Sequence, residues 1–156
     1  MQPVNARRVL MGGLLAGLAM NVGHGIAEGF GMRGEMEQTL GRLALPPLTG
    51  SAMVAMAASA FVIGVIAVWL YAALRPRYGA GPGTAARAGF AVWLLGCLLP
   101  HVSLLACGVL QPRLFTMSVV SDLIVVPLAT LLGGWLYREQ QGAEETVRAH
   151  SAHAHA

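Results

Sequence analysis

Four long apolar stretches alternate with short polar segments along this chain of 156 residues. They cover residues 9–32, 53–74, 89–110 and 114–137, and the second contains neither a charged residue nor a histidine. Crossing the ~30 Å hydrocarbon core of a bilayer takes about 20 helical residues. Because lipid offers the backbone no hydrogen bonds, each stretch must pair its own N–H and C=O groups as a helix. The pattern predicts an all-α integral membrane four-helix bundle over residues 1–138.

Composition and charge fit this class. Hydrophobic residues make up 56% of the chain and charged residues 11%, which suits a lipid environment. All ten basic residues are arginines. If the chain crosses the membrane four times, seven of them lie on the side that holds both termini and three lie on the opposite side. The positive-inside rule then predicts that both termini are cytoplasmic. We expect the protein to lie in the inner (cytoplasmic) membrane. The arginines form no basic face with aromatic residues, which argues against a nucleic-acid partner.

The two ends of the chain carry different signals. The first apolar run is longer than a signal-peptide core and ends without a small-x-small cleavage site, so we expect an uncleaved first span. Residues 139–156 are polar and include His150, His153 and His155. We expect a disordered, histidine-containing cytoplasmic tail. Its histidines are interpreted as incidental, because an unstructured segment fixes no metal geometry.

Two smaller features concern the first loop and the cysteines. Met36, Leu40 and Leu43 recur at helical spacing, which predicts a short interfacial helix before Pro46-Pro47. Cys97 and Cys107 are ten residues apart on one predicted helix, a separation of about 15 Å, whereas a disulfide needs Cα atoms within ~7 Å. We expect both cysteines to be buried small apolar residues.

Few polar side chains interrupt the apolar stretches, and these are the candidate functional residues. They are Asn21, His24 and Glu28 in the first stretch, His101 in the third and Asp122 in the fourth. At about 1.5 Å per residue, His24, His101 and Asp122 lie within roughly one helical turn of each other in depth. We predict a buried polar cluster in the outer half of the membrane, with Glu28 at its mouth.

Glycines share a face with these polar residues on a helical wheel of the first stretch. The spacings Gly13-x-x-x-Gly17 and Gly25-x-x-x-Gly29 allow close approach of a neighbouring helix, and Gly133 lies on the corresponding stripe of the fourth stretch. We predict that these five glycines are helix-packing positions. Besides lipid, we expect such faces to contact other membrane subunits or a second copy of the chain.

The buried ionisable residues admit several functions. A charge at the bilayer centre costs about 2.5–3.5 kcal/mol on insertion scales, so such groups mark an internal pairing or a functional site. The favoured hypothesis is a non-enzymatic membrane subunit or structural component without a cofactor, in which Asp122 holds helices together through His24 or His101. The second is a proton- or ion-coupled carrier, because histidine titrates near neutral pH. The third is a haem- or metal-binding redox subunit with His24 and His101 as ligands. A hydrolytic serine is least favoured, because serines in membrane helices usually bond to their own backbone.

A resemblance rests on Asn21 in the first span, Met36 and Leu40-Gly41 in the first loop, and the sequence Gly-Phe-Ala-Val-Trp-Leu-Leu at residues 89–95. The chain resembles small bacterial four-span membrane proteins classed as a domain of unknown function, over most of residues 8–138. The resemblance implies the four-span topology. That family brings no established activity, cofactor or catalytic residue with it.

Overall fold

Helices form the part of the protein that the computed structural model describes, residues 4–154 for the backbone and 4–137 for side chains. In chain order the elements are α1 (Ala6–Ala27), the π-helical turn η1 (Glu28–Met32), α2 (Arg33–Arg42), α3 (Gly50–Tyr78), α4 (Pro82–Trp93), the π-helical turn η2 (Leu94–Leu98), α5 (Leu99–Ala106) and α6 (Pro112–Ala154). No strand occurs within this range. The all-α prediction is confirmed.

Four helical runs are long and apolar enough to cross a membrane: Ala6–Arg42, Gly50–Tyr78, Pro82–Ala106 and Pro112–Tyr137. The prediction of four such helices is confirmed. The third run starts earlier and ends earlier than the predicted 89–110. Pro82 starts it because a proline in the first helical turn leaves no N–H unpaired. Gly108 follows its end with a φ of 72°, a left-handed conformation common just after helices. Cys107 is therefore exposed at the end of the helix, which corrects its predicted burial.

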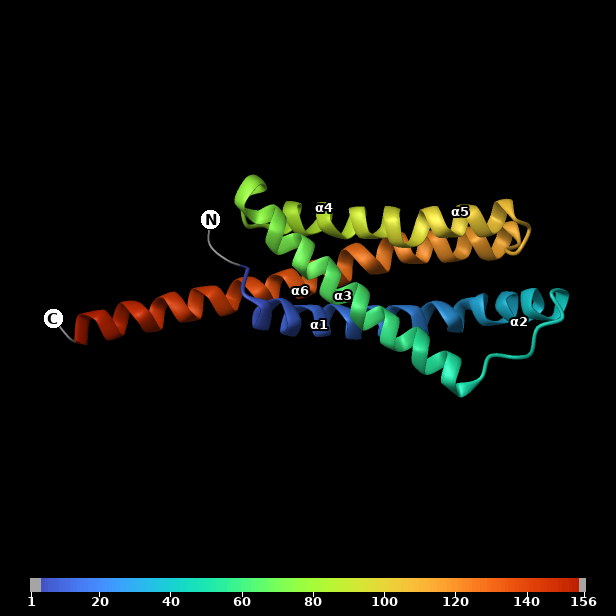
Figure 1. The fold of residues 1–156 in the computed structure, drawn as a ribbon, viewed down its shortest axis with the longest axis horizontal. Helices are drawn as coiled ribbons and strands as arrows, with labels where there is room; N and C mark the ends of the chain where they lie inside the picture. The colour runs from blue at the N-terminus through green and yellow to red at the C-terminus, as the bar shows by residue number, and fades with distance from the viewer. Residues whose placement is uncertain (1–3, 155–156) are drawn as a thin grey trace.

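The first run continues past Met32 through a kink. Phe30 and Gly31 leave helical geometry inside η1, and Gly31 has a φ of 100°, which glycine adopts at little cost. The chain then resumes as α2, which contains most of the interfacial helix expected at residues 36–43. In Figure 1, α2 continues roughly along the line of α1, so the first span and most of the first loop form one helical run that is interrupted at η1.

Figure 1 shows α1, α6 and the α4–α5 segment running along the long axis of the molecule, while α3 crosses them obliquely. The start of α1 and the turn between α3 and α4 lie toward one end. At the other end lie α2 and the turn between α5 and α6. The arrangement brings α1 against both α3 and α6, and α4 against α6.

Large side chains face outward and small ones face inward on α1. Leu10, Leu14, Leu18, Val22 and Ile26 form a stripe at four-residue spacing, and each is about half exposed. The buried side of the same helix consists largely of glycine and alanine. This pattern is typical of membrane helices, which contact lipid through large apolar side chains and each other through small ones.

Two tyrosines and an arginine meet between α3 and α6, near the end of the molecule where α1 begins. Tyr71 of α3 is fully buried and meets Tyr137 of α6 edge to face, with ring centroids 6.1 Å apart. The Arg75 guanidinium lies over both rings, 5.9 and 5.3 Å from their centroids. Cation–π contacts of this kind stabilise a desolvated arginine, and here they join α3 to α6.

Beyond Tyr137 the backbone of α6 stays helical to Ala154, where composition predicts a disordered tail. Alanine, glutamate, glutamine and arginine dominate residues 138–149, and these are good helix formers even without tertiary contacts. The side chains of residues 138–154, His150 and His153 among them, lie outside the described part of the structure, as do residues 155 and 156.

Candidate functional site between α1 and α6

Glycines set the distance between α1 and its two neighbours. A Cβ added to Gly12 would lie 2.6 Å from the carbonyl oxygen of Gly133 in α6, and one added to Gly133 would lie 2.5 Å from that of Gly12. On the side facing α3, a Cβ at Gly13 or Gly17 would lie 2.5 Å from the Cα of Val65 or Phe61 respectively. Only glycine fits these positions, so backbone meets backbone at three of the predicted packing positions, Gly13, Gly17 and Gly133.

The second predicted glycine pair behaves differently. A Cβ at Gly25 or Gly29 would meet nothing within 4 Å. Both residues are exposed, and Gly29 lies in η1, where the helix begins to kink. These two glycines therefore take no part in packing within the described part of the chain.

His24 and Asp122 form the central polar contact. His24 Nε2 of α1 lies 3.0 Å from Asp122 Oδ1 of α6, which is hydrogen-bond distance. The Asp122 side chain is 13% exposed and that of His24 is 39% exposed. The carboxylate is thus mostly covered by protein, while the imidazole keeps one side open.

Cys97, which sequence analysis treats as an apolar residue, is a third member of this contact. It lies in η2, and its buried thiol is a hydrogen-bond neighbour of the Asp122 carboxylate. Pro100, two residues after η2, lacks the N–H that would close a regular α-helical turn. The π-helical turn just before it is a common response to such a gap, and here it carries Cys97.

His101 bonds to its own helix. Its Nδ1 lies 2.7 Å from the carbonyl oxygen of Cys97, one turn earlier. Because a carbonyl only accepts, this contact places a proton on Nδ1 and leaves Nε2 as the remaining ring nitrogen. The structure therefore places His101 next to Cys97, with no hydrogen bond from its ring to His24 or Asp122.

Asn21 links α1 to α3. Its Nδ2 donates to the carbonyl oxygens of Gly17, 2.9 Å away on the same helix, and of Ala57, 3.3 Å away on α3. The side chain of Glu28 of η1 is exposed and makes no hydrogen bond or ion pair with another side chain or backbone group of the described range, although its backbone N–H caps α1. Of the five predicted polar residues, the structure thus brings His24 and Asp122 into direct contact and gives Asn21 and His101 separate backbone partners.

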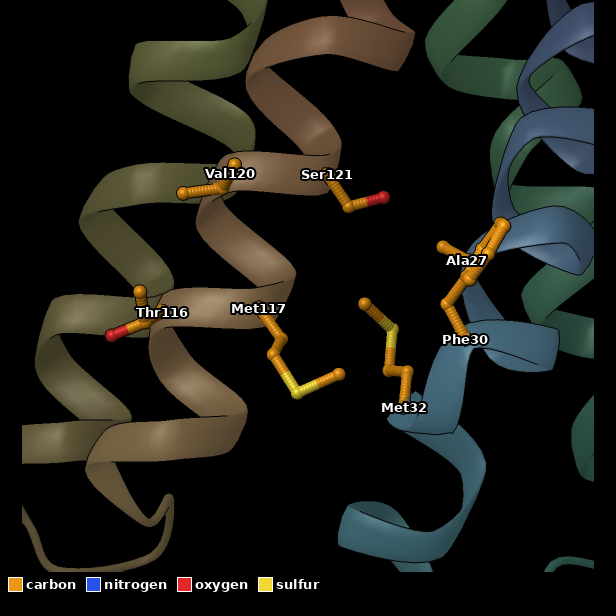
Figure 2. Close-up of a pocket in the computed structure, with 7 residues that line it drawn as sticks. All are labelled: Ala27, Phe30, Met32, Thr116, Met117, Val120 and Ser121. Carbon is orange, nitrogen blue, oxygen red and sulfur yellow. The ribbon is translucent and has the colours of Figure 1, made fainter.

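A pocket of about 370 Å³ opens beside this contact, between η1 and α6. We call it the α1–α6 pocket; its lining residues are Ala27, Phe30, Met32, Thr116, Met117, Val120 and Ser121. Figure 2 shows Met32 and Met117 facing each other across the gap and the Ser121 hydroxyl pointing into it. Ala27 follows His24 by one turn, and Ser121 directly precedes Asp122. The pocket therefore lies immediately next to the polar contact.

A second polar contact links α2 to the start of α6. Arg113 Nη1, at the start of α6, lies 3.1 Å from Glu35 Oε1 of α2, and the Glu35 side chain is 10% exposed. Arg42 donates to the carbonyl oxygens of Gly108 and Val109 at 3.1 and 2.7 Å. Sequence analysis assigns these residues to loops. The opposite charges of Glu35 and Arg113, in two predicted loops on the same side of the membrane, are the one sequence signal that points to their pairing.

The chemistry of the site follows from these contacts. The His24 imidazole and the Asp122 carboxyl share one hydrogen bond between α1 and α6, and the imidazole stays partly exposed. Among the described side chains, no three His, Cys, Asp or Glu residues are close enough together to hold a metal ion. Ser103 donates to the carbonyl oxygen of Leu99 in its own helix, 3.1 Å away, as serines in membrane helices commonly do.

The fold and the site together define the class: an all-helical protein with four helices long and apolar enough to make it a multi-pass membrane protein. No protein-family model, curated protein or solved structure matches the chain. The resemblance to small four-span bacterial proteins therefore rests on the sequence alone.

Proposed function

We propose that this chain is a small multi-pass protein of the bacterial inner membrane, with both termini cytoplasmic, that acts as a non-enzymatic membrane subunit or structural component. The His24–Asp122 contact carries the proposal, because it uses two ionisable groups within the apolar helices to join α1 to α6. Asn21 joins α1 to α3 in the same way. Polar groups that hydrogen-bond across helices stabilise a membrane fold without any ligand.

A double-mutant cycle tests this role. His24→Leu and Asp122→Leu each leave one polar group without its partner, and we expect each to lower the free energy of unfolding in detergent by about 1–3 kcal/mol. The double variant removes both groups and should recover most of that loss, because an apolar pair of similar size often replaces a buried polar pair. Ser59→Ala, on the exposed side of α3, is the control and should change little. Two single effects that simply add in the double variant would contradict a stabilising pair.

The subunit role predicts a partner at the exposed end of α1. Gly25, Gly29 and Glu28 leave a surface of small residues and one unpaired carboxylate in an apolar helix, and small residues favour contact with another membrane helix. We expect tagged protein from native membranes to co-purify as a complex, either with another membrane protein or with itself. Gly25→Leu with Gly29→Leu should disrupt the complex, whereas Gly96→Leu, at another open glycine, should not. A monomer in both the parent and the variants would remove the subunit role.

A proton-coupled carrier is the second candidate, and one observation favours it. His24 is 39% exposed, and the α1–α6 pocket begins one turn further along the helix at Ala27, so a solute in the pocket would lie near the ionisable pair. In proteoliposomes, an imposed pH gradient should then drive uptake that Asp122→Asn abolishes. Uptake that persists in Asp122→Asn would rule out coupling through this pair.

A further inference from the structure

We propose that the turn between α3 and α4 binds the phosphate head group of an anionic phospholipid, with Arg77 and Arg87 as the cationic side chains. The proposal goes beyond the structural role above and does not depend on it. It rests on two arginines that share one aromatic ring, on the lack of a counter-charge beside them among the described side chains, and on the place of the turn at the end of two apolar helices.

Tyr78 brings two positive charges together from different helices. The Arg77 guanidinium lies 5.9 Å and the Arg87 guanidinium 5.2 Å from the centroid of the Tyr78 ring. Arg87 belongs to the second turn of α4. Because side chains on a helix lean toward its N-terminus, this arginine reaches back to the end of α3. Attraction between each cation and the ring holds both guanidinium groups beside the turn, although like charges repel one another.

No described carboxylate neutralises this pair. Arg77 and Arg87 are exposed and make no hydrogen bond or ion pair with the described residues. The acidic residues whose side chains are described lie in η1, in α2 and in the middle of α6; they are Glu28, Glu35, Glu37 and Asp122. Figure 1 shows α2 at the opposite end of the molecule from the α3–α4 turn. An anion from outside the described chain is therefore the natural partner of the pair.

The arginines at the opposite end show the contrast. Each of them has an acceptor within the protein: Arg33 pairs with Glu37, Arg113 pairs with Glu35, and Arg42 donates to the carbonyl oxygens of Gly108 and Val109. Those guanidinium groups are used in joining or supporting helices. The pair at the α3–α4 turn keeps its donors for a ligand, and a guanidinium presents them in a planar fork that matches a phosphate.

The backbone of the turn adds to this attraction. Thr84 is buried, and its Oγ1 donates to the carbonyl oxygens of Tyr78 and Gly79 at 3.3 and 2.9 Å, which fixes the turn. No side chain caps the N-terminus of α4, and N–H groups at a helix start favour negative charge. A Cβ added to Gly81 or Gly83 would meet nothing within 4 Å, so a head group can approach the backbone there.

The position of the turn favours a lipid over a soluble anion. It joins two helices long and apolar enough to cross a membrane, so it lies where the membrane meets water. Phe90 is 50% exposed and follows Arg87 by one turn on the same face of α4, in the direction of the membrane interior. A phospholipid meets both features at once, with its phosphate against the arginines and an acyl chain along Phe90. A soluble anion meets only the first.

Native mass spectrometry of the full chain, released from detergent micelles, tests the site. The probe is dioleoyl phosphatidylglycerol, and the measurement is the Kd of the first bound lipid. Arg77→Gln and Arg87→Gln should each raise this Kd about fivefold, the loss expected for one arginine beside an anionic lipid. The double variant should exceed either single one. Arg7→Gln is the matched control, because it removes an exposed arginine near the same end, at the start of α1, and should leave the Kd nearly unchanged.

Two further probes separate the sources of the phosphate. Dioleoyl phosphatidylcholine has the same acyl chains without net charge and should bind at least several times more weakly. Glycerol phosphate has the charge without acyl chains and should not displace phosphatidylglycerol at equal concentration. Equal binding of the two lipids, or an equal effect of Arg7→Gln and Arg87→Gln, would show no local anionic site and would overturn the proposal. Displacement by glycerol phosphate would show a site for free phosphate and would overturn the lipid assignment.

Discussion

Gly13→Ala is the sharpest test of how this membrane fold is held together. The added Cβ would lie 2.5 Å from the Cα of Val65 and 2.9 Å from its backbone nitrogen, whereas ordinary van der Waals contact begins at 3.4 Å. Backbone atoms in the middle of α3 cannot rotate away as a side chain can. The two helices must therefore separate by most of an ångström along this contact.

The cost can be estimated from packing. A gap of 0.5–1 Å forfeits a quarter to a half of each dispersion contact, and overpacking a filled interior costs about 1–3 kcal/mol. Gly25 provides a matched control on the same helix, because an added Cβ there meets nothing. Gly25→Ala should be neutral or stabilise by about 0.5–1 kcal/mol through the better helix propensity of alanine. Gly13→Ala gains the same propensity, so we expect the two variants to differ by the overpacking cost alone, about 1–3 kcal/mol in free energy of unfolding.

Equilibrium unfolding by SDS titration of the detergent-solubilised protein, followed by tryptophan fluorescence, measures this difference. Gly64→Ala approaches the same contact from α3, since its Cβ would lie 2.5 Å from the Gly13 carbonyl oxygen. The combination of Gly13→Ala with Gly64→Ala should cost less than the sum of the two, because the first substitution already separates the helices. Equal stability of Gly13→Ala and Gly25→Ala would refute the close contact between α1 and α3.

Three further predictions follow from single side chains. Trp93→Phe removes the Nε1 hydrogen bond to the carbonyl oxygen of Val119, 3.1 Å away, and should lower the free energy of unfolding by about 1–2 kcal/mol. Trp135, which is 55% exposed, is the control, and Trp135→Phe should cost less than half as much. Equal losses in the two variants would contradict the prediction. In a Cys97→Ala background, a membrane-impermeant maleimide should label Cys107 from the periplasmic side of intact cells if the termini are cytoplasmic, and labelling only in inverted vesicles would reverse the orientation. The structural role predicts a colourless purified protein, whereas a Soret band that His24→Ala abolishes would establish the redox hypothesis.

The number of membrane helices follows from the sequence because lipid imposes it. A run of about 20 apolar residues has no other way to satisfy its backbone in a bilayer. Packing partners follow less directly. Gly13-x-x-x-Gly17 and Gly25-x-x-x-Gly29 have the same spacing, yet only the first pair touches α3. The sequence pattern does not encode the oblique course of α3 or the kink at Gly31, and these decide which pair finds a neighbour.

The polar residues show the same limit. Depth follows from counting residues, so sequence analysis could place His24, His101 and Asp122 at a similar level. Direction around the helix is harder to predict. The π-helical turn η2 lies between Trp93 and His101 and shifts the register of every later residue relative to a regular wheel. His101 accordingly bonds to the Cys97 carbonyl, and the Cys97 thiol takes the place beside Asp122.

The position of the His24–Asp122 pair has a geometric reason. Toward the N-terminus of α1, Gly12 and Gly133 let the backbones of α1 and α6 touch, which leaves no room for side chains between them. Past His24 the helices part at η1, and the α1–α6 pocket opens. The His24–Asp122 pair bridges α1 and α6 in the zone between these two regions. The pair thus lies at the last level where α1 and α6 still meet, so breaking it should widen the adjacent pocket before it loosens the glycine contact. Hydrogen exchange in Asp122→Leu should therefore rise first at residues 24–32 and leave residues 9–17 protected, and a uniform rise along α1 would contradict this order.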